Sequence, residues 1–184
     1  MTSLTQFPVP LLGFAAFSGT GKTTLIEQLI PLLIAQGLRV ALVKHSHHDI
    51  DMDKPGKDSY RLRKAGASQV VLAGTHRSIC FHEHEQAHDS QLSEQLALLN
   101  TKSLDLVLVE GYRDQAFPKI ELHRSVLQKP FLFSTDTNII GLVCDQAVNA
   151  GELPLFEFTQ LQNIVTFILN QVIAVKSIKA VENK

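Results

Sequence analysis

One short segment near the start of the chain constrains the fold more than any other: Ala16-Phe17-Ser18-Gly19-Thr20-Gly21-Lys22-Thr23-Thr24. It departs from the phosphate-binding pattern G-x-x-x-x-G-K-[ST] only at Ala16, where the pattern has glycine. Glycines let successive N–H groups turn toward phosphate oxygens, lysine adds charge beside the β- and γ-phosphates, and a threonine hydroxyl suits Mg²⁺. The residues predicted to bind a nucleotide are Ser18, Gly19, Thr20, Gly21, Lys22, Thr23 and Thr24.

The flanking residues favour the strand–loop–helix order that such a loop needs. An apolar run of strand length, residues 11–17, precedes the loop, and a mostly apolar helical pattern, residues 25–34, follows it. A helix beginning at the loop would direct its positive dipole end at the phosphates. Pro31 predicts a kink or a break of this helix near Glu27, because proline lacks the N–H that an inner turn requires.

Strand-like and helix-like segments alternate along the rest of the chain. Strands are expected at residues 39–45, 69–74, 78–82, 104–111, 120–123 and 139–144, and helices at 58–65, 89–100 and 161–175. This order predicts an α/β fold: a three-layer P-loop NTPase domain with a mostly parallel sheet. The segments 69–74 and 78–82 predict a hairpin, an antiparallel excursion. Its exposed edge would pair in a homodimer, unless residues 124–138 cover it.

Size and composition limit the classes of protein to consider. The 184 residues are expected to form a single domain, 1–184, with flexible ends at 1–10 and 176–184. The 17 basic and 18 acidic residues give a net charge of −1, which argues against nucleic acid or an anionic membrane as partner. No signal peptide or membrane span is recognised. Cys80 and Cys144 are expected to be buried thiols, which fits a cytoplasmic protein.

A P-loop needs a carboxylate that holds Mg²⁺ directly or through water. Glu110 is the leading candidate, because it ends the apolar run of residues 106–109 and a buried carboxylate without a partner would be costly. Asp49, in the loop after the second expected strand, is a second candidate for the metal shell or for polarising a water. The predicted metal residues are therefore Thr23, Glu110 and Asp49.

Two further contacts are predicted from position. Lys54, Lys57 and Arg61 follow the second expected strand and could neutralise a second anionic ligand; the alternative is a solvated loop of mixed charge. No Asn-Lys-x-Asp guanine-reading motif is present, so the residues leave the base undetermined. Asp145, after the last expected strand, is a candidate base contact.

Histidines form two clusters that suggest a transition-metal site as an alternative. They are His45, His47 and His48, and His82, His84 and His88. Neither Cys-x-x-Cys nor a helical His-x-x-x-His pair supports that reading, and the competing interpretation is surface or hydrogen-bonded histidines.

Four segments together resemble the MobB family, the molybdopterin-guanine dinucleotide biosynthesis adapter proteins. They are Phe17-Ser18-Gly19-Thr20-Gly21-Lys22-Thr23-Thr24, Val43-Lys44-His45-Ser46-His47-His48-Asp49, the run from Asp53-Lys54-Pro55-Gly56-Lys57-Asp58-Ser59 to Ala67, and Leu104-Asp105-Leu106-Val107-Leu108-Val109-Glu110-Gly111-Tyr112. The second and third segments are more specific than the P-loop. The resemblance extends from about Leu11 to Asp145.

The resemblance implies a GTP- and Mg²⁺-binding adapter that dimerises through its sheet. Such an adapter assists the guanylyltransferase that joins GMP to molybdopterin, and it is at most a weak GTPase. Carried over by motif, Ser18 to Thr24 bind the triphosphate, Thr23 and Glu110 serve Mg²⁺, and residues 49–61 face the nucleotide. Binding of the pterin phosphate by Lys54, Lys57 and Arg61 is our hypothesis.

Three other functions are compatible with the sequence. The Val-Glu-Gly strand end is similar to that of dethiobiotin synthetase, which would make the chain a small-molecule ATP-dependent enzyme. The histidines suggest a GTPase metallochaperone for nickel enzymes. A pure adapter, in which nucleotide sets only the conformation, is the third. Turnover without a partner would indicate the first, and metal binding the second.

Overall fold

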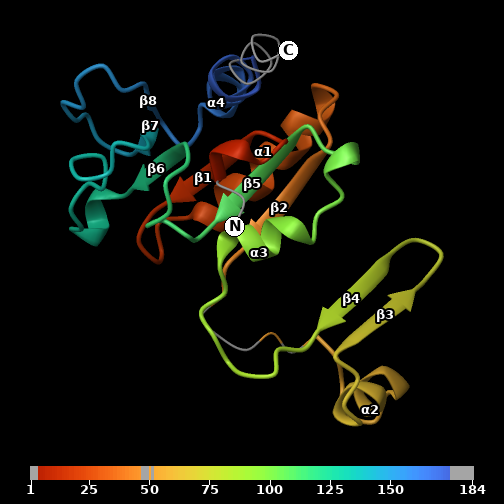
Figure 1. Ribbon diagram of the computed structural model, residues 1–184. Helices are drawn as coiled ribbons and strands as arrows, with labels where there is room; N and C mark the ends of the chain where they lie inside the picture. Colours follow the sequence, from red (N-terminus) through yellow and green to blue (C-terminus); the bar gives the residue numbers. More distant parts are fainter. Residues whose placement is uncertain (1–3, 47–49, 51, 175–184) are drawn as a thin grey trace. The chain divides into compact units, whose positions relative to one another are not determined.

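The computed structural model describes residues 4–46, 50 and 52–174, which fall into two compact units (Figure 1). Met1–His45 and Gln91–Lys184 make the large unit, and Ser46–Ser90 the small one. The strands of the large unit are β1 (Leu11–Ala15), β2 (Val40–Lys44), β5 (Leu106–Glu110), β6 (Lys119–His123), β7 (Ile139–Cys144) and β8 (Leu155–Phe156). Its helices are α1 (Lys22–Ala35), α3 (Leu92–Ala97) and α4 (Leu161–Ile168), which continues as a π-helix over Leu169–Ile173, with short 3-10 helices at Leu4–Gln6, Thr101–Ser103 and Ser125–Leu127.

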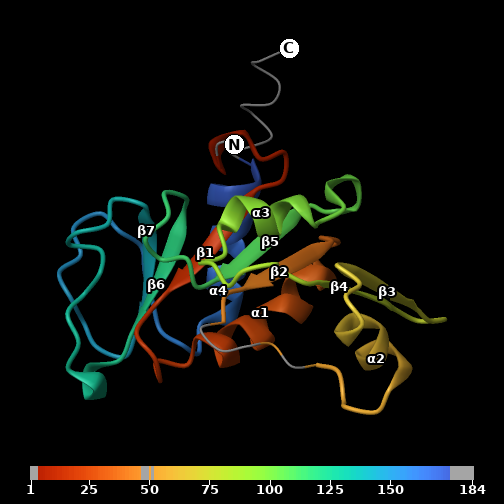
Figure 2. The same cartoon turned by 60° about the horizontal axis from the view of Figure 1, so that its bottom comes forward.

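The six strands of the large unit form one parallel sheet in the order β2-β5-β1-β6-β7-β8. Figure 2 shows β2, β5, β1, β6 and β7 of this sheet. The register pairs Phe14 with Glu110 and Lys44 with the same Glu110. The carboxyl ends of β1, β2 and β5 are therefore level. This is the edge at which ligands bind in open α/β sheets.

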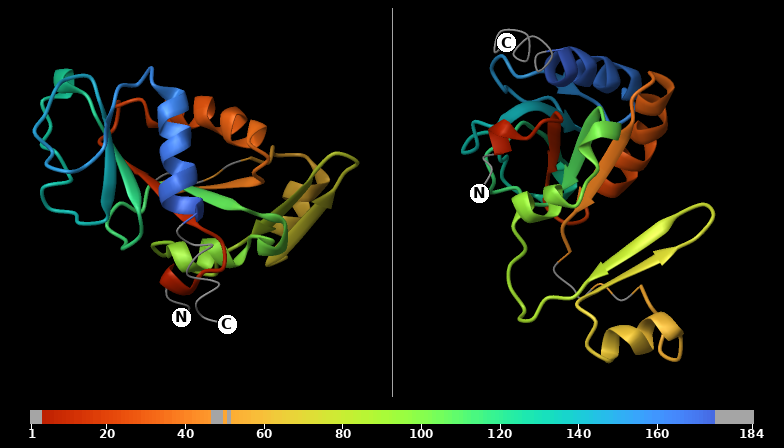
Figure 3. Two further views of the ribbon diagram at one scale, coloured as in Figure 1. Left: turned by 90° about the horizontal axis from the view of Figure 1, so that it is seen from above. Right: turned by 45° about the vertical axis from the view of Figure 1, so that its right-hand side comes forward.

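Helices cover both faces of this sheet, which gives three layers (Figures 1 and 3). On one face, α1 and α4 pack on buried side chains that include Leu12, Phe14 and Leu108. On the other, α3 packs on Val107 and Val109. Successive strand residues point to opposite faces, so strands covered on both sides are apolar throughout. The three-layer α/β fold expected from the sequence is thus confirmed.

The small unit contains α2 (Asp58–Lys64), β3 (Gln69–Ala73) and β4 (Ser78–His82). The two strands form an antiparallel hairpin, as the sequence predicted. Asp53 is the single buried residue among those described between 46 and 90. It accepts a hydrogen bond from the Ser59 hydroxyl (3.0 Å) and pairs with Arg63 (3.4 Å).

Several local expectations differ from the structure. The helix α1 runs unbroken through Pro31, because Pro31 and Glu27 are both exposed and water can bond the Glu27 carbonyl that proline leaves without a donor. Cys80 is exposed and not buried, whereas Cys144 is buried as expected. Residues 1–10 were expected to be a flexible end, yet Phe7 and Val9 are buried in the core.

Candidate nucleotide site

The loop between β1 and α1 has the backbone conformation that its glycines allow. Gly19 and Gly21 have φ of 80° and 97°, a left-handed region that favours glycine. Thr20 is buried and its hydroxyl donates to the Phe17 carbonyl over 2.7 Å, which closes the loop on itself. Ala16 does not require a positive φ, so the missing first glycine leaves the loop unstrained. The loop and the first turn of α1 therefore present their N–H groups at one place.

Lys22 lies at the start of α1, and its side chain reaches back over the loop. Its ammonium donates to the carbonyls of Ala16 (3.1 Å) and Phe17 (3.3 Å). Burial lowers the pKa of Lys22 from its ordinary value, Glu110 opposes this effect, and the cations Lys44 and Arg113 add to it. The site thus gathers positive charge at the loop, as a polyphosphate ligand requires.

Thr23 and Glu110 lie side by side although 87 residues separate them in the chain. The Thr23 hydroxyl donates to Glu110 Oε1 over 3.2 Å, and Glu110 is largely buried at the end of β5. One hydroxyl and one carboxylate are hard oxygen donors, which Mg²⁺ prefers. The donor set fits a magnesium ion held by Thr23 directly and by Glu110 directly or through water.

Lys44 is a member of this site that sequence reasoning missed. Its ammonium lies 3.2 Å from Glu110 Oε2 and 3.5 Å from the Thr23 hydroxyl. The sequence contained a hint of this role, because Lys44 is the last residue but one of the second expected strand, residues 39–45. Only the pairing of β2 with β5, which aligns Lys44 with Glu110, makes it meaningful.

The residues after Glu110 hold the strand end in place. Gly111 has φ of 97°, and a Cβ there would lie 2.6 Å from the His45 Cβ. Tyr112 has φ of 51° and stacks on the His45 ring, with ring centroids 4.6 Å apart. The Glu-Gly-Tyr sequence therefore brings the end of β5 against the end of β2.

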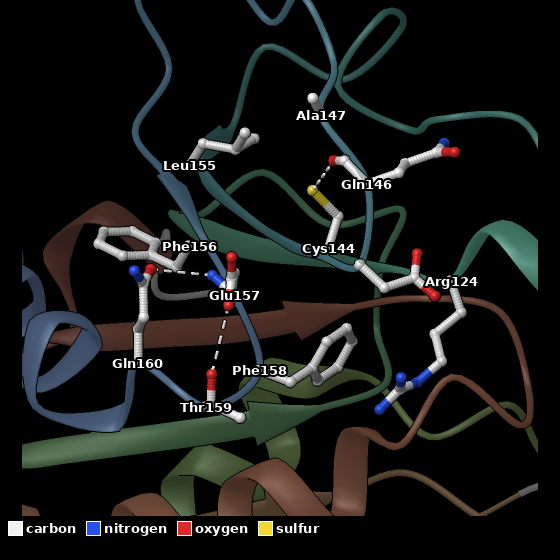
Figure 4. A pocket seen from close by; sticks show the side chains of 11 residues that line it. Arg124, Cys144, Gln146, Ala147, Leu155, Phe156, Glu157, Phe158, Thr159 and Gln160 are labelled. Carbon is white, nitrogen blue, oxygen red and sulfur yellow. Dashed lines mark hydrogen bonds between the residues drawn. The ribbon is translucent and has the colours of Figure 1, made fainter.

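A cavity of about 570 Å³ opens beside the loop (Figure 4). Arg124 borders it, with its guanidinium 3.9 Å above the centre of the Phe158 ring and its Nε donating to the Thr20 carbonyl over 3.2 Å. A second hollow, of about 450 Å³, shares Arg124 and Phe158 and reaches Gly21 and the start of α1. The two hollows connect the P-loop to the carboxyl end of β7.

Asp145, the candidate base contact, lines the larger cavity. Its Oδ1 accepts the Ser125 N–H over 2.9 Å. This bond holds the pKa of Asp145 below its ordinary value, so the side chain is a carboxylate at neutral pH. Cys144 and Gln146 line another part of the wall, where the thiol donates to the Gln146 carbonyl (Figure 4).

Other predicted site residues lie elsewhere. Asp49 is outside the described residues. Lys54, Lys57 and Arg61 are exposed in the small unit, where Arg61 approaches Asp58 at 3.8 Å. His82, His84 and His88 have neighbouring rings. Over residues 4–46, 50 and 52–174, however, no three His, Cys, Asp or Glu side chains are placed to hold a metal ion.

Among the residues that the structure describes, no helix combines the length and the apolar character needed to span a bilayer.

Comparison with known proteins identifies relatives over most of the chain. Residues 11–145 match the model of the family described as MobB, molybdopterin guanine dinucleotide synthesis protein B. The chain is 41% identical over 162 residues to the molybdopterin-guanine dinucleotide biosynthesis adapter protein of Escherichia coli, with coverage of 88% of this chain and 92% of the relative. It is 40% identical over 163 residues to the protein of that description from Haemophilus influenzae, covering 88% and 89%.

A solved structure supports the same assignment. The crystal structure of a molybdopterin-guanine biosynthesis protein B is similar with a TM-score of 0.68 and 26% identity, over 87% of this chain and 98% of that one. Its similarity spans nearly the whole of the solved protein. The chain belongs to the MobB family.

Proposed function

We propose that the chain is a GTP-binding adapter in the formation of molybdopterin guanine dinucleotide. The proposal rests on one observation: the Thr23 hydroxyl, which follows the P-loop lysine, donates to Glu110 over 3.2 Å in a chain of the MobB family. The names of the Escherichia coli and Haemophilus influenzae relatives support the adapter role and the pathway. The nucleotide would be bound with Mg²⁺.

Several residues of the loop would contact the triphosphate. The N–H groups of residues 19–24 would bond phosphate oxygens, and Lys22 would exchange the Ala16 and Phe17 carbonyls for the β- and γ-phosphates. Thr23 and Glu110 would hold Mg²⁺, which when bound neutralises charge on the phosphates. Asp49, which follows the second strand in the sequence, is proposed to join this metal shell.

The cavity beside Arg124 would receive the base. Guanine carries N1–H and N2–H₂ donors on one edge, and an ionised carboxylate accepts both, whereas adenine presents an acceptor there. Asp145 is such a carboxylate, oriented by Ser125. The stacked pair of Arg124 and Phe158 would line the face of the ring. These contacts support GTP over ATP.

Hydrolysis would be slow. Arg113 is a candidate for an arginine that stabilises charge on the γ-phosphate, but its guanidinium lies over the Phe17 ring at 5.6 Å. A protein with this arrangement would keep its nucleotide long enough to act as an adapter. We therefore expect at most weak GTPase activity without a partner.

Two partners follow from the proposal. One is a second copy of the chain, bound through the hairpin: an isolated pair of strands is only marginally stable, and Val71 is 64% exposed on β3 in the single chain. The other is the guanylyltransferase that attaches GMP to molybdopterin. The proposed setting for this reaction is the cytoplasm.

Lys54, Lys57 and Arg61 are proposed to contact the phosphate of molybdopterin. All three are exposed in the small unit. Among the described residues, Arg61 lies 3.8 Å from Asp58, and no acidic side chain forms an ion pair with Lys54 or Lys57. Replacing all three by alanine should abolish pterin binding. The control is Lys102→Ala, which removes an exposed charge in the large unit, and unchanged pterin affinity in the triple variant would reject the assignment.

The proposed function is tested by reconstitution with a purified guanylyltransferase, molybdopterin and limiting GTP. Adding the chain should raise the yield of guanine dinucleotide, and the Lys22→Ala variant should raise it less. Measuring GTP and ATP turnover without the transferase separates the alternatives. Fast ATP turnover with no effect on the yield would contradict the adapter role and favour a small-molecule ATP-dependent enzyme.

A further inference from the structure

The ammonium of Lys44 lies beside both side chains that would hold Mg²⁺. It is 3.2 Å from Glu110 Oε2 and 3.5 Å from Thr23 Oγ, while the hydroxyl and the carboxylate lie 3.2 Å apart through Oε1. The three groups form a small triangle with the cation at one corner. A lysine ammonium is a compact point charge, and here it neutralises a carboxylate that is largely buried.

A magnesium ion bound by the same two oxygens would have to displace this ammonium. A divalent ion on Thr23 and Glu110 would lie within a few ångströms of the Lys44 nitrogen, and like charges at such a distance repel strongly. The side chain of Lys44 is 51% exposed and carries four methylenes, so it can move without disturbing the sheet. The exchange therefore needs no rearrangement of the backbone.

The phosphate of a bound nucleotide would offer the displaced ammonium a new ion-pair partner close by. Lys44 ends β2 at the carboxyl edge of the sheet, level with Glu110, and its charge already lowers the pKa of Lys22 in the P-loop. The terminal phosphate of a nucleotide in this loop would lie beyond Lys22 and beside Mg²⁺. It would be the nearest new negative charge.

We propose that Lys44 is an exchangeable counter-ion: it pairs with Glu110 beside Thr23 until the magnesium–nucleotide complex binds, and it then pairs with the terminal phosphate. This inference rests on the proposed nucleotide site. Lys44 would keep the divalent ion from binding without nucleotide, and it would favour the triphosphate over the diphosphate. The chain would thereby couple metal binding to the arrival of the correct ligand.

The test measures binding of Mn²⁺, a paramagnetic substitute for Mg²⁺, to nucleotide-free protein by electron paramagnetic resonance. Lys44→Met keeps the length of the side chain and removes its charge, so it should tighten Mn²⁺ binding by about tenfold or more. Lys44→Arg keeps the charge and should bind Mn²⁺ as weakly as the unmodified chain. Lys102→Met, with its charge lost at an exposed site, should also leave binding unchanged.

A second measurement compares GTP and GDP affinities by calorimetry in excess Mg²⁺. The unmodified chain should prefer GTP, and Lys44→Met should reduce that preference about tenfold, the loss expected for one charge-assisted contact. Unchanged Mn²⁺ binding in Lys44→Met would overturn the counter-ion role, and an unchanged preference would overturn the pairing with phosphate. If the unmodified chain binds neither nucleotide, the proposed function itself fails, and this is a distinct result.

Discussion

The buried ammonium of Lys119 gives a prediction whose size follows from its contacts. Lys119 is 1% exposed on β6 and pairs with Asp136 at 2.7 Å. It also donates to the carbonyls of Arg113 (2.6 Å) and Gln115 (2.8 Å). These bonds fix the segment between β5 and β6, next to the P-loop strand β1, which pairs with Lys119 through Gly13.

Replacing Lys119 by methionine should lower the free energy of unfolding by about 3 kcal/mol. Methionine retains the apolar stem, but two carbonyls lose their donor and the Asp136 carboxylate loses its cation, and breaking a buried pair by removing one partner costs about 3–5 kcal/mol. The lower end applies because the Asp136 side chain is 23% exposed. For a chain of this length, that loss corresponds to a fall in melting temperature of roughly 6–12 °C.

A double-mutant cycle measured by urea denaturation isolates the pair. Asp136→Asn keeps the shape and removes the charge, and the double variant should cost less than the sum of the single changes, by about 0.5–3 kcal/mol. Lys102→Met, an exposed substitution, should change stability by less than about 0.5 kcal/mol. A loss below about 1 kcal/mol for Lys119→Met, or additivity in the cycle, would refute the reasoning.

The same pair makes a prediction about pH. Burial alone would raise the pKa of Asp136, but the hydrogen bonds from Lys119 and Asn138 hold it below its ordinary value. The stability that ionised Asp136 contributes is therefore present above the unfolded pKa and is lost as the pH falls through the lowered folded pKa. The difference in stability between the unmodified chain and Asp136→Asn should shrink on acidification below about pH 4.

Three further substitutions test other parts of the account. Gly111→Ala should lower the free energy of unfolding, measured by urea denaturation, by about 3 kcal/mol. The reason is that Gly111 has φ of 97° and that a Cβ there would lie 2.6 Å from the His45 Cβ. A neutral effect would contradict the close approach of the ends of β2 and β5. Asp145→Asn should weaken GTP binding about tenfold while leaving ATP unchanged in calorimetry; equal losses for both nucleotides would argue against base reading. Val71→Glu should convert dimers into monomers in analytical ultracentrifugation. The control, Ile34→Glu at a site 55% exposed on α1, should not. A dimer that survives Val71→Glu would exclude the hairpin edge as the dimer interface.

Local pattern was enough to predict the elements that carry the phosphate site. The spacing of glycines before Lys22 predicts the loop, and the apolar run ending in Glu110 predicts a buried strand with a carboxylate at its end. Thr23 and Glu110 are brought together because β1, which leads into the P-loop, pairs directly with β5, which ends at Glu110. Two short strand-like segments on either side of Thr75-His76-Arg77 likewise predicted the hairpin of β3 and β4.

Features that depend on strand register and on burial of charge were not predictable. Lys44 looks like an ordinary strand-end cation until β2 is known to pair with β5. Lys119 looks like a surface residue, and only the fold shows that Asp136 and two carbonyls surround it. The cavity lined by Arg124 and Phe158 joins segments that are 34 positions apart and share no motif.

The effect of Pro31 and the division of the chain into two units could not be predicted from the sequence, for a different reason. Pro31 was expected to kink or break its helix, and no break occurs, because the effect of a proline depends on whether the carbonyl one turn earlier faces water; Glu27, one turn before Pro31, is exposed. The segment 46–90 forms a compact unit with one buried residue among those described, a feature that the composition of the segment does not reveal.

The most direct test of the central claim is calorimetric titration of the chain with GTP and with ATP in the presence of Mg²⁺. We expect GTP to bind more tightly, and Lys22→Ala to weaken its binding by roughly 1.5–3 kcal/mol, about ten- to a hundredfold, while Lys102→Ala does not. Preference for ATP would contradict the assignment of the base, and GTP binding unaffected by Lys22→Ala would contradict the assignment of the site.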